Sequence, residues 1–301
     1  MRVTVTGASG LIGSRLVEAL VARGDEVTAL SRDRERARER LGVEAVAWNP
    51  EDEPAPASAL SGRTGVVHLA GEPIAQRWSK DAKQRIVSSR GLGTRNLVLG
   101  LQEANPRPEV LVSASGVGYY GARGDERLDE SSAPGDDFLA DVCQVWERMA
   151  GEAAELGMRV AITRTGVVLD RSGGALETML PPFRLGVGGP VAGGRQFVSW
   201  IHPDDLVGMY LAALDGAQWS GPVNTTAPHP ATNRELSRAL GRVLRRPAVL
   251  PLPGFVLRTL YGEMSWVVTT GQRAIPARAQ ELGFAFRHPN LDEALRAALQ
   301  P

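Results

Sequence analysis

Residues 3–13 read VTVTGASGLIG, a β-branched run that leads directly into Gly7, Gly10 and Gly13. Apolar residues with helical spacing follow at once, so the stretch predicts a strand, a glycine turn and a helix. In such a unit the first glycine makes the tight turn, the second lets a pyrophosphate approach the backbone, and the third lets the helix pack close to the strand. Amides of the first helical turn then bind the phosphates. The stretch therefore predicts a dinucleotide site formed by Gly7, Ser9, Gly10, Leu11, Ile12 and Gly13.

The composition of the 301-residue chain is that of a globular protein without a dominant charge. Hydrophobic residues make up 43% of it, enough for a large packed core, and 34 acidic residues balance 34 basic ones. The zero net charge provides no long-range attraction to nucleic acid or to an anionic membrane surface. No apolar run approaches the length needed to span a bilayer, and no secretory leader is recognisable. We therefore expect a cytoplasmic protein with no nucleic-acid or membrane partner.

Strand-like and helix-like segments alternate along the first half of the chain. The longest helices are expected at residues 80–104 and 138–156. Apolar strands separated by helices are typical of an α/β protein whose parallel sheet is covered on both faces. Right-handed crossovers then favour the doubly wound Rossmann order 3-2-1-4-5-6, with the ligand at the carboxyl ends of the strands. The six strands are expected at residues 3–6, 26–30, 43–48, 65–70, 110–114 and 159–163.

Beyond residue 164 the sequence changes in character, and we expect a smaller substrate lobe there. Glycine and proline pairs such as Gly173-Gly174 and Pro181-Pro182 break the chain into short elements. The expected division is a Rossmann domain at residues 1–165 and a mixed α/β lobe at 166–301. This lobe includes a C-terminal helical segment at 250–301 and can exchange elements with the core. Its helices are predicted at residues 203–214, 233–244, 254–261 and 291–299.

The residues after the second strand indicate which dinucleotide is bound. A site for NAD usually has an acidic residue about 20 residues after the glycine turn, where it binds the ribose 2′-hydroxyl. This chain has Ser31 and Arg32 in that region. A guanidinium binds a 2′-phosphate through two charge-assisted hydrogen bonds, and a serine hydroxyl can add another donor. Arg32 could instead simply begin a charged surface helix, and Asp33 favours NAD, but we expect NADP(H) bound by Ser31 and Arg32.

Five further stretches resemble motifs of one enzyme family. They read HLAGEPI at 68–74, SASGVGYYG at 113–121, RTGVVL at 164–169, FVSWIHPDD at 197–205 and QRAIPARAQELGF at 272–284. With the glycine turn, they make the chain resemble an atypical extended short-chain dehydrogenase/reductase of the NAD-dependent epimerase/dehydratase family. Within that family it is similar to the epimerase-like subfamily often labelled nucleoside-diphosphate-sugar epimerase, which ends in a small domain of unknown function. The resemblance covers essentially the whole chain.

The resemblance implies a Rossmann domain that holds NADP(H) and a lobe that closes over a small substrate bearing a hydroxyl or carbonyl group. It places the loop after the fourth strand, with Leu69, Ala70 and Gly71, against the nicotinamide half of the cofactor. We also expect Arg164, in the RTGVVL stretch, to contact the cofactor. Members of the family often dimerise through the two long helices that flank the sheet, which implies a homodimer.

The chain departs from the family pattern at the residues that transfer a proton. The wider family uses a tyrosine followed four residues later by a lysine, and the lysine lowers the tyrosine pKa. None of the four tyrosines has such a lysine, and the helix expected to carry the pair has Cys143 and Glu147 in the stretch CQVWE. These two residues are four apart and so share a helix face. The Glu147 carboxylate should keep a neighbouring thiol protonated and should favour the oxidised, cationic nicotinamide.

Four residues are candidates for the chemistry. Ser115 ends the fifth strand, where the family's serine contacts the substrate, and Tyr120 in the following loop is the best remaining proton donor. Cys143 could be a weak acid or a nucleophile, although a small thiol packed behind the cofactor is the simpler interpretation. Glu147 could accept hydrogen bonds from the nicotinamide ribose. As the chain's one cysteine, Cys143 also rules out an internal disulfide and a multi-cysteine metal site.

No metal site is expected from the sequence. The four histidines are scattered along the chain without the spacing of metal ligands. The stretch HPDD at 202–205 has the pattern of a helix start, with proline at the first helical position and acidic residues in the first turn.

Three functions stay open from the sequence. The first, which we favour, is an NADP(H)-dependent oxidoreductase or epimerase-like enzyme that acts on a small polar molecule. The second is a catalytically silent NADP(H)-binding protein that acts as a sensor or binds a partner, as the missing tyrosine-lysine pair suggests. The third is thiol chemistry at Cys143 with a different cofactor bound in the lobe.

Overall fold

A parallel seven-stranded sheet forms the centre of the protein, whose computed structural model describes residues 1–300. Neighbouring strands lie in the order β11-β7-β5-β4-β1-β2-β3, and every pairing is parallel. For the six strands predicted from the sequence, this is the order 3-2-1-4-5-6, so the doubly wound α/β fold is confirmed. The strands are β1 (Arg2–Thr6), β2 (Glu26–Ser31), β3 (Glu44–Ala47), β4 (Gly65–His68), β5 (Val110–Gly116), β7 (Arg159–Thr165) and β11 (Gly221–Thr225).

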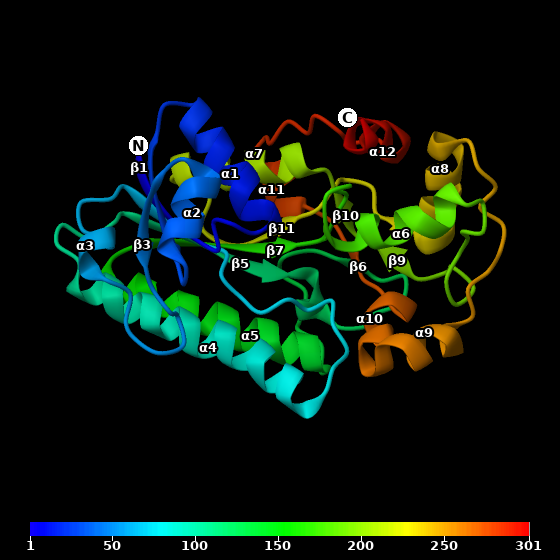
Figure 1. The fold of residues 1–301 in the computed structure, drawn as a ribbon, viewed down its shortest axis with the longest axis horizontal. Coiled ribbons are helices and arrows are strands. Elements are labelled where there is room, and N and C mark those ends of the chain that lie inside the picture. The colour runs from blue at the N-terminus through cyan, green and yellow to red at the C-terminus, as the bar shows by residue number, and fades with distance from the viewer. Residues whose placement is uncertain (301) are drawn as a thin grey trace.

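Helices cover both faces of this sheet (Figure 1). On one face α4 (Lys80–Glu103) lies beside α5 (Phe138–Gly151), and on the other α1 (Leu11–Ala22) packs with α7 (Pro203–Asp215). Because both faces are covered, β4 is buried along its whole length, which explains the apolar residues that precede His68. None of the helices within residues 1–300 is long and apolar enough to cross a membrane. Two shorter helices of this part of the chain are α2 (Arg34–Leu41) and α3 (Ala57–Leu60).

The carboxyl ends of four neighbouring strands meet at one edge of the sheet. In the register of the sheet, Thr6 of β1 lies beside His68 of β4, and His68 lies beside Ser113 of β5. Ser115 lies in turn beside Arg164 of β7. The glycine turn after β1 and the loops after β4 and β5 therefore come together at this edge, which is where a doubly wound sheet binds its ligand.

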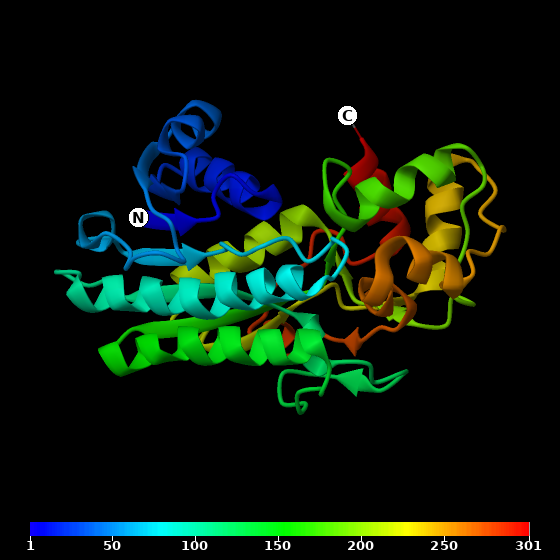
Figure 2. The same ribbon diagram turned by 60° about the horizontal axis from the view of Figure 1, so that its bottom comes forward.

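A smaller lobe lies at one end of the sheet, as Figures 1 and 2 show. Its apolar core includes Leu176, Leu180, Trp200 and Leu236. The pairing of β6 with β13 fastens the loop after β5 to the C-terminal segment. Helix α11 (Ala277–Glu281) packs against β11 of the sheet, whereas the helices of the lobe are α6 (Gly174–Arg184), α8 (Asn233–Leu244), α9 (Gly254–Tyr261), α10 (Ser265–Thr269) and α12 (Leu291–Leu299). Its short strands are β6 (Arg127–Leu128), β8 (Val167–Val168), β9 (Phe197–Val198), β10 (Trp200–Ile201), β12 (Ala231–Thr232) and β13 (Arg273–Ala274).

Strand β11 and helix α6 differ from the sequence prediction. Strand β11 comes from the region assigned to the lobe but joins the sheet beside β7. Its residues, GPVNT, begin with glycine and proline and end in two buried polar residues, so no apolar pattern marks the strand. Helix α6 contains Pro181 and Pro182 in its last turn, where neither has an N–H to donate but the Pro181 carbonyl still accepts the Leu185 amide at 3.2 Å. The sheet and the lobe therefore exchange a segment of chain.

His68, at the end of β4, makes the stability of the fold depend on pH. Its ring is fully buried, with Nδ1 2.8 Å from the Thr6 hydroxyl and Nε2 3.0 Å from the Thr94 hydroxyl. Burial, and after it the charge of Arg90, lowers the pKa of His68 from 6.5 to about 3. Between these two values the unfolded chain binds a proton that the folded chain does not, so stability falls as the pH decreases.

Acidification from about pH 6.5 to about pH 5 should therefore lower the free energy of unfolding by about 2 kcal/mol through His68 alone. Urea unfolding at the two pH values measures the effect. The variant His68→Gln lacks the titrating group and should lose about 2 kcal/mol less than the wild type on acidification. His229→Gln, which removes an exposed histidine, is the control and should behave as the wild type. An equal loss in His68→Gln and the wild type would show that another group carries the pH dependence.

Candidate functional site

The turn between β1 and α1 has the geometry that a pyrophosphate requires. Gly7 has a positive φ of 65°, and a Cβ there would lie 2.7 Å from the carbonyl carbon of Leu69. A Cβ on Gly13 would lie 2.2 Å from the Gly7 carbonyl oxygen, so α1 reaches the turn only with glycine at this position. Gly10, the N-cap of α1, has more room, since its Cβ would lie 3.2 Å from the same oxygen. Gly7 and Gly13 thus have the turn and packing roles that the sequence predicts.

The first turn of α1 leaves its amides available to an anion. No side chain within residues 1–300 caps this helix, whereas Ser79 and Asp137 cap the two long helices. The amides of Leu11 and Ile12 therefore have no side-chain acceptor in the part of the chain that is described. Ser9 is exposed beside them. Free helix N-terminal amides and the helix dipole together bind phosphate, so the residues present fit the pyrophosphate of a dinucleotide.

Arg32 is the cation that the structure makes available to a 2′-phosphate. It is exposed after β2 and forms no ion pair with the residues that the structure describes. Asp33, the residue that favoured NAD, caps α2 instead, because its carboxylate accepts the Arg36 amide at 3.0 Å. Ser31 donates its hydroxyl hydrogen to the Asp33 carbonyl oxygen at 3.0 Å. Ser31 would have to give up this bond to donate to a phosphate.

The loop after β4 lies against the glycine turn. The amides of Leu69 and Ala70 donate to the Thr6 hydroxyl, at 3.2 Å in both cases. Gly71 follows and faces the guanidinium of Arg90, whose central carbon would lie 3.1 Å from a Cβ at that position. Leu69 and Ala70, two of the three residues expected at the nicotinamide half of the cofactor, are therefore beside the glycine turn, and Gly71 lies against Arg90.

Ser115, Glu147 and Arg164 form a buried hydrogen-bonded group where β5 and β7 end. The Ser115 hydroxyl donates to Glu147 Oε1 at 2.7 Å. Arg164 binds both carboxylate oxygens, Nε to Oε1 and Nη2 to Oε2, at 2.8 Å in each case. The side chains of Arg164 and Glu147 are only 4% and 11% exposed, so they form a buried ion pair.

This ion pair changes two expectations drawn from the sequence. Arg164 neutralises the Glu147 carboxylate, so Glu147 does not present the free negative charge that would favour the oxidised nicotinamide. Arg164 also donates through Nη1 to the Tyr120 hydroxyl at 3.0 Å. Its guanidinium is thus held inside the protein by Glu147 and Tyr120, which argues against the cofactor contact expected for Arg164.

Tyr120 is placed as a structural residue. It is fully buried, and its hydroxyl donates to Asn224 Oδ1 at 2.7 Å, so no hydrogen is left for a substrate. Burial raises the pKa of Tyr120 to about 12. The neighbouring Tyr119 is only partly buried, its ring centroid lies 3.4 Å from the guanidinium carbon of Arg164, and its hydroxyl has no partner among the described residues. This arrangement argues against Tyr120 as the proton donor and makes Tyr119 the available tyrosine.

Cys143 is a buried, neutral thiol. It is 6% exposed, and its Sγ donates to the Gly116 carbonyl oxygen at 3.6 Å. Burial, followed by the Glu147 carboxylate, raises the pKa of Cys143 to about 11. Because the thiolate is the reactive form, the structure favours a thiol packed behind the site over a nucleophile. Cys143 and Glu147 both face the end of β5, as their four-residue spacing predicts.

Arg90 of α4 is a residue of this region that the sequence analysis missed. Its guanidinium carbon lies 4.8 Å from the Trp146 ring centroid, and Nη1 donates to the carbonyls of Glu72 at 2.9 Å and Ile86 at 3.3 Å. Burial lowers the pKa of Arg90 to about 10, and no carboxylate within residues 1–300 forms an ion pair with it. Arg90 therefore brings a buried positive charge to the loop at Gly71, with the Glu72 carboxylate near it but not in an ion pair with it. Its local sequence, SSRG, does not distinguish it from the many surface arginines.

The stretch HPDD begins α7, as the sequence predicts. His202 is the N-cap residue, and its Nδ1 accepts the Asp204 amide at 3.2 Å. The Asp205 carboxylate instead accepts two amides of the C-terminal segment, that of Arg287 at 2.7 Å and that of His288 at 3.0 Å. The start of α7 therefore also holds the C-terminal segment in place.

A doubly wound parallel sheet with a glycine turn in its first βα unit defines a dinucleotide-binding protein of the short-chain dehydrogenase/reductase type. Residues 3–224 match the model of the NAD dependent epimerase/dehydratase family, and residues 252–298 match a domain of unknown function, DUF1731. The chain therefore belongs to the NAD dependent epimerase/dehydratase family. These matches confirm the family and the C-terminal domain that the sequence motifs resemble. They also confirm that the expected cofactor belongs to the nicotinamide class.

Relatives match along nearly the whole chain. The epimerase family protein SDR39U1 homolog, chloroplastic, of Arabidopsis thaliana is 43% identical, over 100% of this chain and 87% of its own length. The crystal structure of human epimerase family protein SDR39U1 (isoform2) with NADPH has a TM-score of 0.88 and 35% identity, with 99% of both chains covered. The nucleoside-diphosphate sugar epimerase from Corynebacterium glutamicum has a TM-score of 0.79 and 35% identity, with 99% of this chain and 58% of that chain covered.

Proposed function

We propose that this chain binds NADP(H) and uses it to oxidise or reduce a small substrate that bears a hydroxyl or carbonyl group. The glycine turn carries the proposal, because Gly7 and Gly13 have no room for a side chain and the first-turn amides of α1 are uncapped. Arg32, exposed and without an ion pair within residues 1–300, supports the phosphorylated form of the cofactor. The human relative crystallised with NADPH supports the same choice.

The side chains at the strand ends would handle the proton that accompanies the hydride, which the bound cofactor supplies or accepts. Ser115 gives its hydrogen to Glu147, so toward a substrate it offers acceptor lone pairs, which suit a substrate hydroxyl. Tyr119 takes the place of Tyr120 as the proposed proton donor. Arg90 adds positive charge that would stabilise an oxyanion formed from a substrate carbonyl.

Transfer of deuteride from 4-deuterated NADPH to a panel of aldehydes, ketones and keto sugars, followed by mass spectrometry, tests this function. Tyr119→Phe should slow the transfer about 100-fold or more, since a positioned general acid contributes about 10²–10⁴-fold. Tyr120→Phe is the matched control. It should cost about 1–3 kcal/mol of stability by leaving the buried Asn224 carbonyl without its donor, with little change in transfer by the folded protein. The reverse pattern, with transfer lost only in Tyr120→Phe, would contradict the assignment.

A catalytically silent NADP(H)-binding protein, acting as a sensor or binding a partner, is the second candidate function. One observation favours it. The buried side chains of Ser115, Glu147, Arg164 and Tyr120 make hydrogen bonds to one another, which engages the polar groups that a substrate would otherwise contact. The deuteride assay separates the two functions. Tight binding of both NADPH and NADP⁺, with no transfer to any member of the panel, would select the silent protein.

We also propose a homodimer and a cytoplasmic location, which both follow from the sequence-based expectations. Leu92 and Leu99 support the dimer, because they are 40% and 37% exposed on α4, one of the two long helices. Light scattering on the purified chain tests it, and the mass of a single chain would exclude it. Cell fractionation tests the location, since the Arabidopsis relative is named as chloroplastic.

A further inference from the structure

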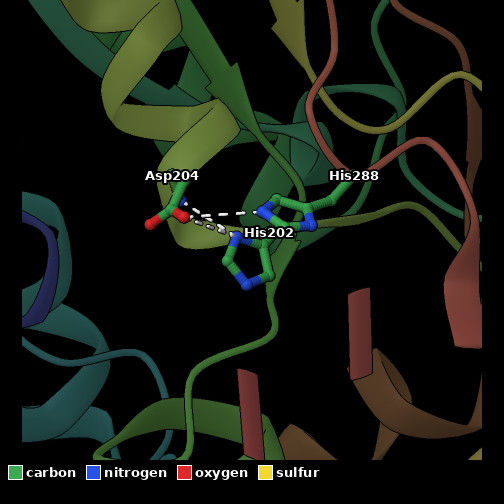
Figure 3. Close-up of side chains that lie close together, drawn as sticks. All are labelled: His202, Asp204 and His288. Carbon is green, nitrogen blue, oxygen red and sulfur yellow. Dashed lines mark hydrogen bonds and ion pairs between the residues drawn. The ribbon is translucent and has the colours of Figure 1, made fainter. Parts of the chain in front are cut away.

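His202, Asp204 and His288 come together from two distant parts of the chain (Figure 3). His202 and Asp204 belong to the start of α7, whereas His288 lies in the C-terminal segment that precedes α12. Figure 3 shows both imidazole rings next to the Asp204 carboxylate, with one nitrogen of each ring turned toward it. Two imidazoles and a carboxylate are therefore gathered at one point of the surface.

The distances between these groups are close to those of a metal site. Asp204 Oδ2 lies 3.7 Å from His202 Nδ1 and 3.4 Å from His288 Nε2, and the three ligand atoms all lie within 4.8 Å of one another. Ligands that are each about 2.0–2.2 Å from a tetrahedral zinc ion are roughly 3.3–3.6 Å apart. The two rings now lie against each other, with centroids 3.8 Å apart and an angle of 39° between their planes, so they would have to turn and separate for both nitrogens to point at one ion.

We propose that His202, Asp204 and His288 bind one divalent transition-metal ion of the zinc class. Two imidazole nitrogens and one carboxylate oxygen are donors that zinc prefers, whereas calcium and magnesium prefer oxygen alone. The Asp204 side chain is 47% exposed, so water can reach the ion and complete its coordination. The ion would link two parts of the chain. His288 lies in the segment that matches the domain of unknown function, and α7 lies in the segment that matches the epimerase/dehydratase family.

The backbone already holds His288 in the position that the proposed site needs. The Asp205 carboxylate accepts the amides of Arg287 and His288 at 2.7 Å and 3.0 Å, which anchors the segment at this point. Asp205 is 1% exposed, so its negative charge is held close to the site. The position of the His288 backbone therefore does not depend on the ion, and binding requires adjustment of the side chains.

The groups around His202 are compatible with a bound cation. The charged groups that act on His202 are His288, Asp204, Asp205 and Arg15, and Arg15 is itself paired with Asp170 at 2.5 Å. The lone pair of His202 Nδ1 now accepts a long hydrogen bond, 3.2 Å, from the Asp204 amide. A bound ion would replace this amide as the partner of the lone pair. The His202 proton then stays on Nε2, which is buried and has no acceptor within residues 1–300. A metal ion at Nδ1 is therefore consistent with the tautomer that the structure requires.

The test is a calorimetric titration of the full chain with Zn²⁺ alone, after removal of any purification tag. We expect one Zn²⁺ per chain, and Co²⁺ in its place should give visible d–d absorption. His288→Gln should weaken Zn²⁺ binding at least about 100-fold, because the loss of even an outer-shell partner costs about 10–100-fold. His229→Gln, which removes an exposed histidine outside the cluster, is the matched control and should bind as the wild type.

A second variant keeps the proposal testable if His288→Gln does not fold. Asp204→Asn preserves the size of the side chain and should lose Zn²⁺ in the same way. Because the ligands come from distant segments, Zn²⁺ should raise the Tm of the wild type but not that of either variant. The proposal is overturned if the wild type shows no stoichiometric binding, if His288→Gln binds as well as the wild type, or if His229→Gln loses the ion.

Discussion

Replacing Arg164 by methionine should lower the free energy of unfolding by about 3–5 kcal/mol, the cost of removing one partner from a buried ion pair. The Glu147 carboxylate, 11% exposed, would keep its charge and lose both hydrogen bonds from the guanidinium. Tyr120 would lose a donor to its buried hydroxyl, and Tyr119 would lose the cation over its ring. Chemical unfolding of Arg164→Met and of the wild type at the same pH measures the difference.

Arg242→Met is the matched control for this substitution. Arg242 also binds a carboxylate through two hydrogen bonds, to Asp292 at 3.0 Å and 2.7 Å, but its side chain is 59% exposed. Loss of an exposed pair costs at most about 1 kcal/mol. The double variant Arg164→Met, Glu147→Met should regain much of the lost stability, because no buried charge is left without a partner. Equal losses in Arg164→Met and Arg242→Met would contradict the structural role of the buried pair.

Gly13→Ala should reduce the affinity for NADPH by about 100-fold or more. The new Cβ would meet the Gly7 carbonyl oxygen at 2.2 Å and backbone atoms of Ala8 at 2.8 Å and 2.9 Å. Because these neighbours are backbone, α1 must move away from the turn, and its first-turn amides would no longer point at the pyrophosphate. Two lost amide-phosphate hydrogen bonds, each worth about 1.5–3 kcal/mol, account for a loss of this size. Fluorescence titration with NADPH measures it.

Gly151→Ala separates this local effect from a general effect of replacing glycine. Gly151 ends α5 with helical backbone angles, and a Cβ there would have no atom within 4 Å. Alanine at this position should leave NADPH binding unchanged and should stabilise the fold by about 0.4–1 kcal/mol. If Gly13→Ala bound NADPH as tightly as Gly151→Ala, the pyrophosphate would not lie at the β1-α1 turn.

The fold could be predicted best from the sequence where neighbouring residues determine the structure. The glycine turn depends on residues only six positions apart, and both Gly7 and Gly13 have the expected conformation or packing. Helix α8 has the bounds that were predicted, and Thr232 and Glu235 form a capping box at its start. Local hydrogen bonds and helical periodicity were sufficient in these cases.

The site was harder to predict because its residues are selected by contacts between distant segments. Tyr119 and Tyr120 are adjacent, and the one that is buried is the one that meets Asn224, 104 residues further along the chain. Asn224 lies in β11, the strand that lacks an apolar pattern. His288 likewise meets His202 only because the C-terminal segment folds back onto α7. No local sequence pattern indicates these contacts.

The ratio of the dissociation constants for NADH and NADPH tests the central claim most directly. We predict that the wild type binds NADPH about 10–100-fold more tightly than NADH, since the 2′-phosphate gains charge-assisted hydrogen bonds from Arg32 worth about 1.5–3 kcal/mol. In Arg32→Ala the ratio should approach one, whereas Arg38→Ala, in the last turn of α2, should keep it. Equal affinities for the two nucleotides in the wild type, or a ratio that Arg32→Ala leaves unchanged, would contradict this assignment.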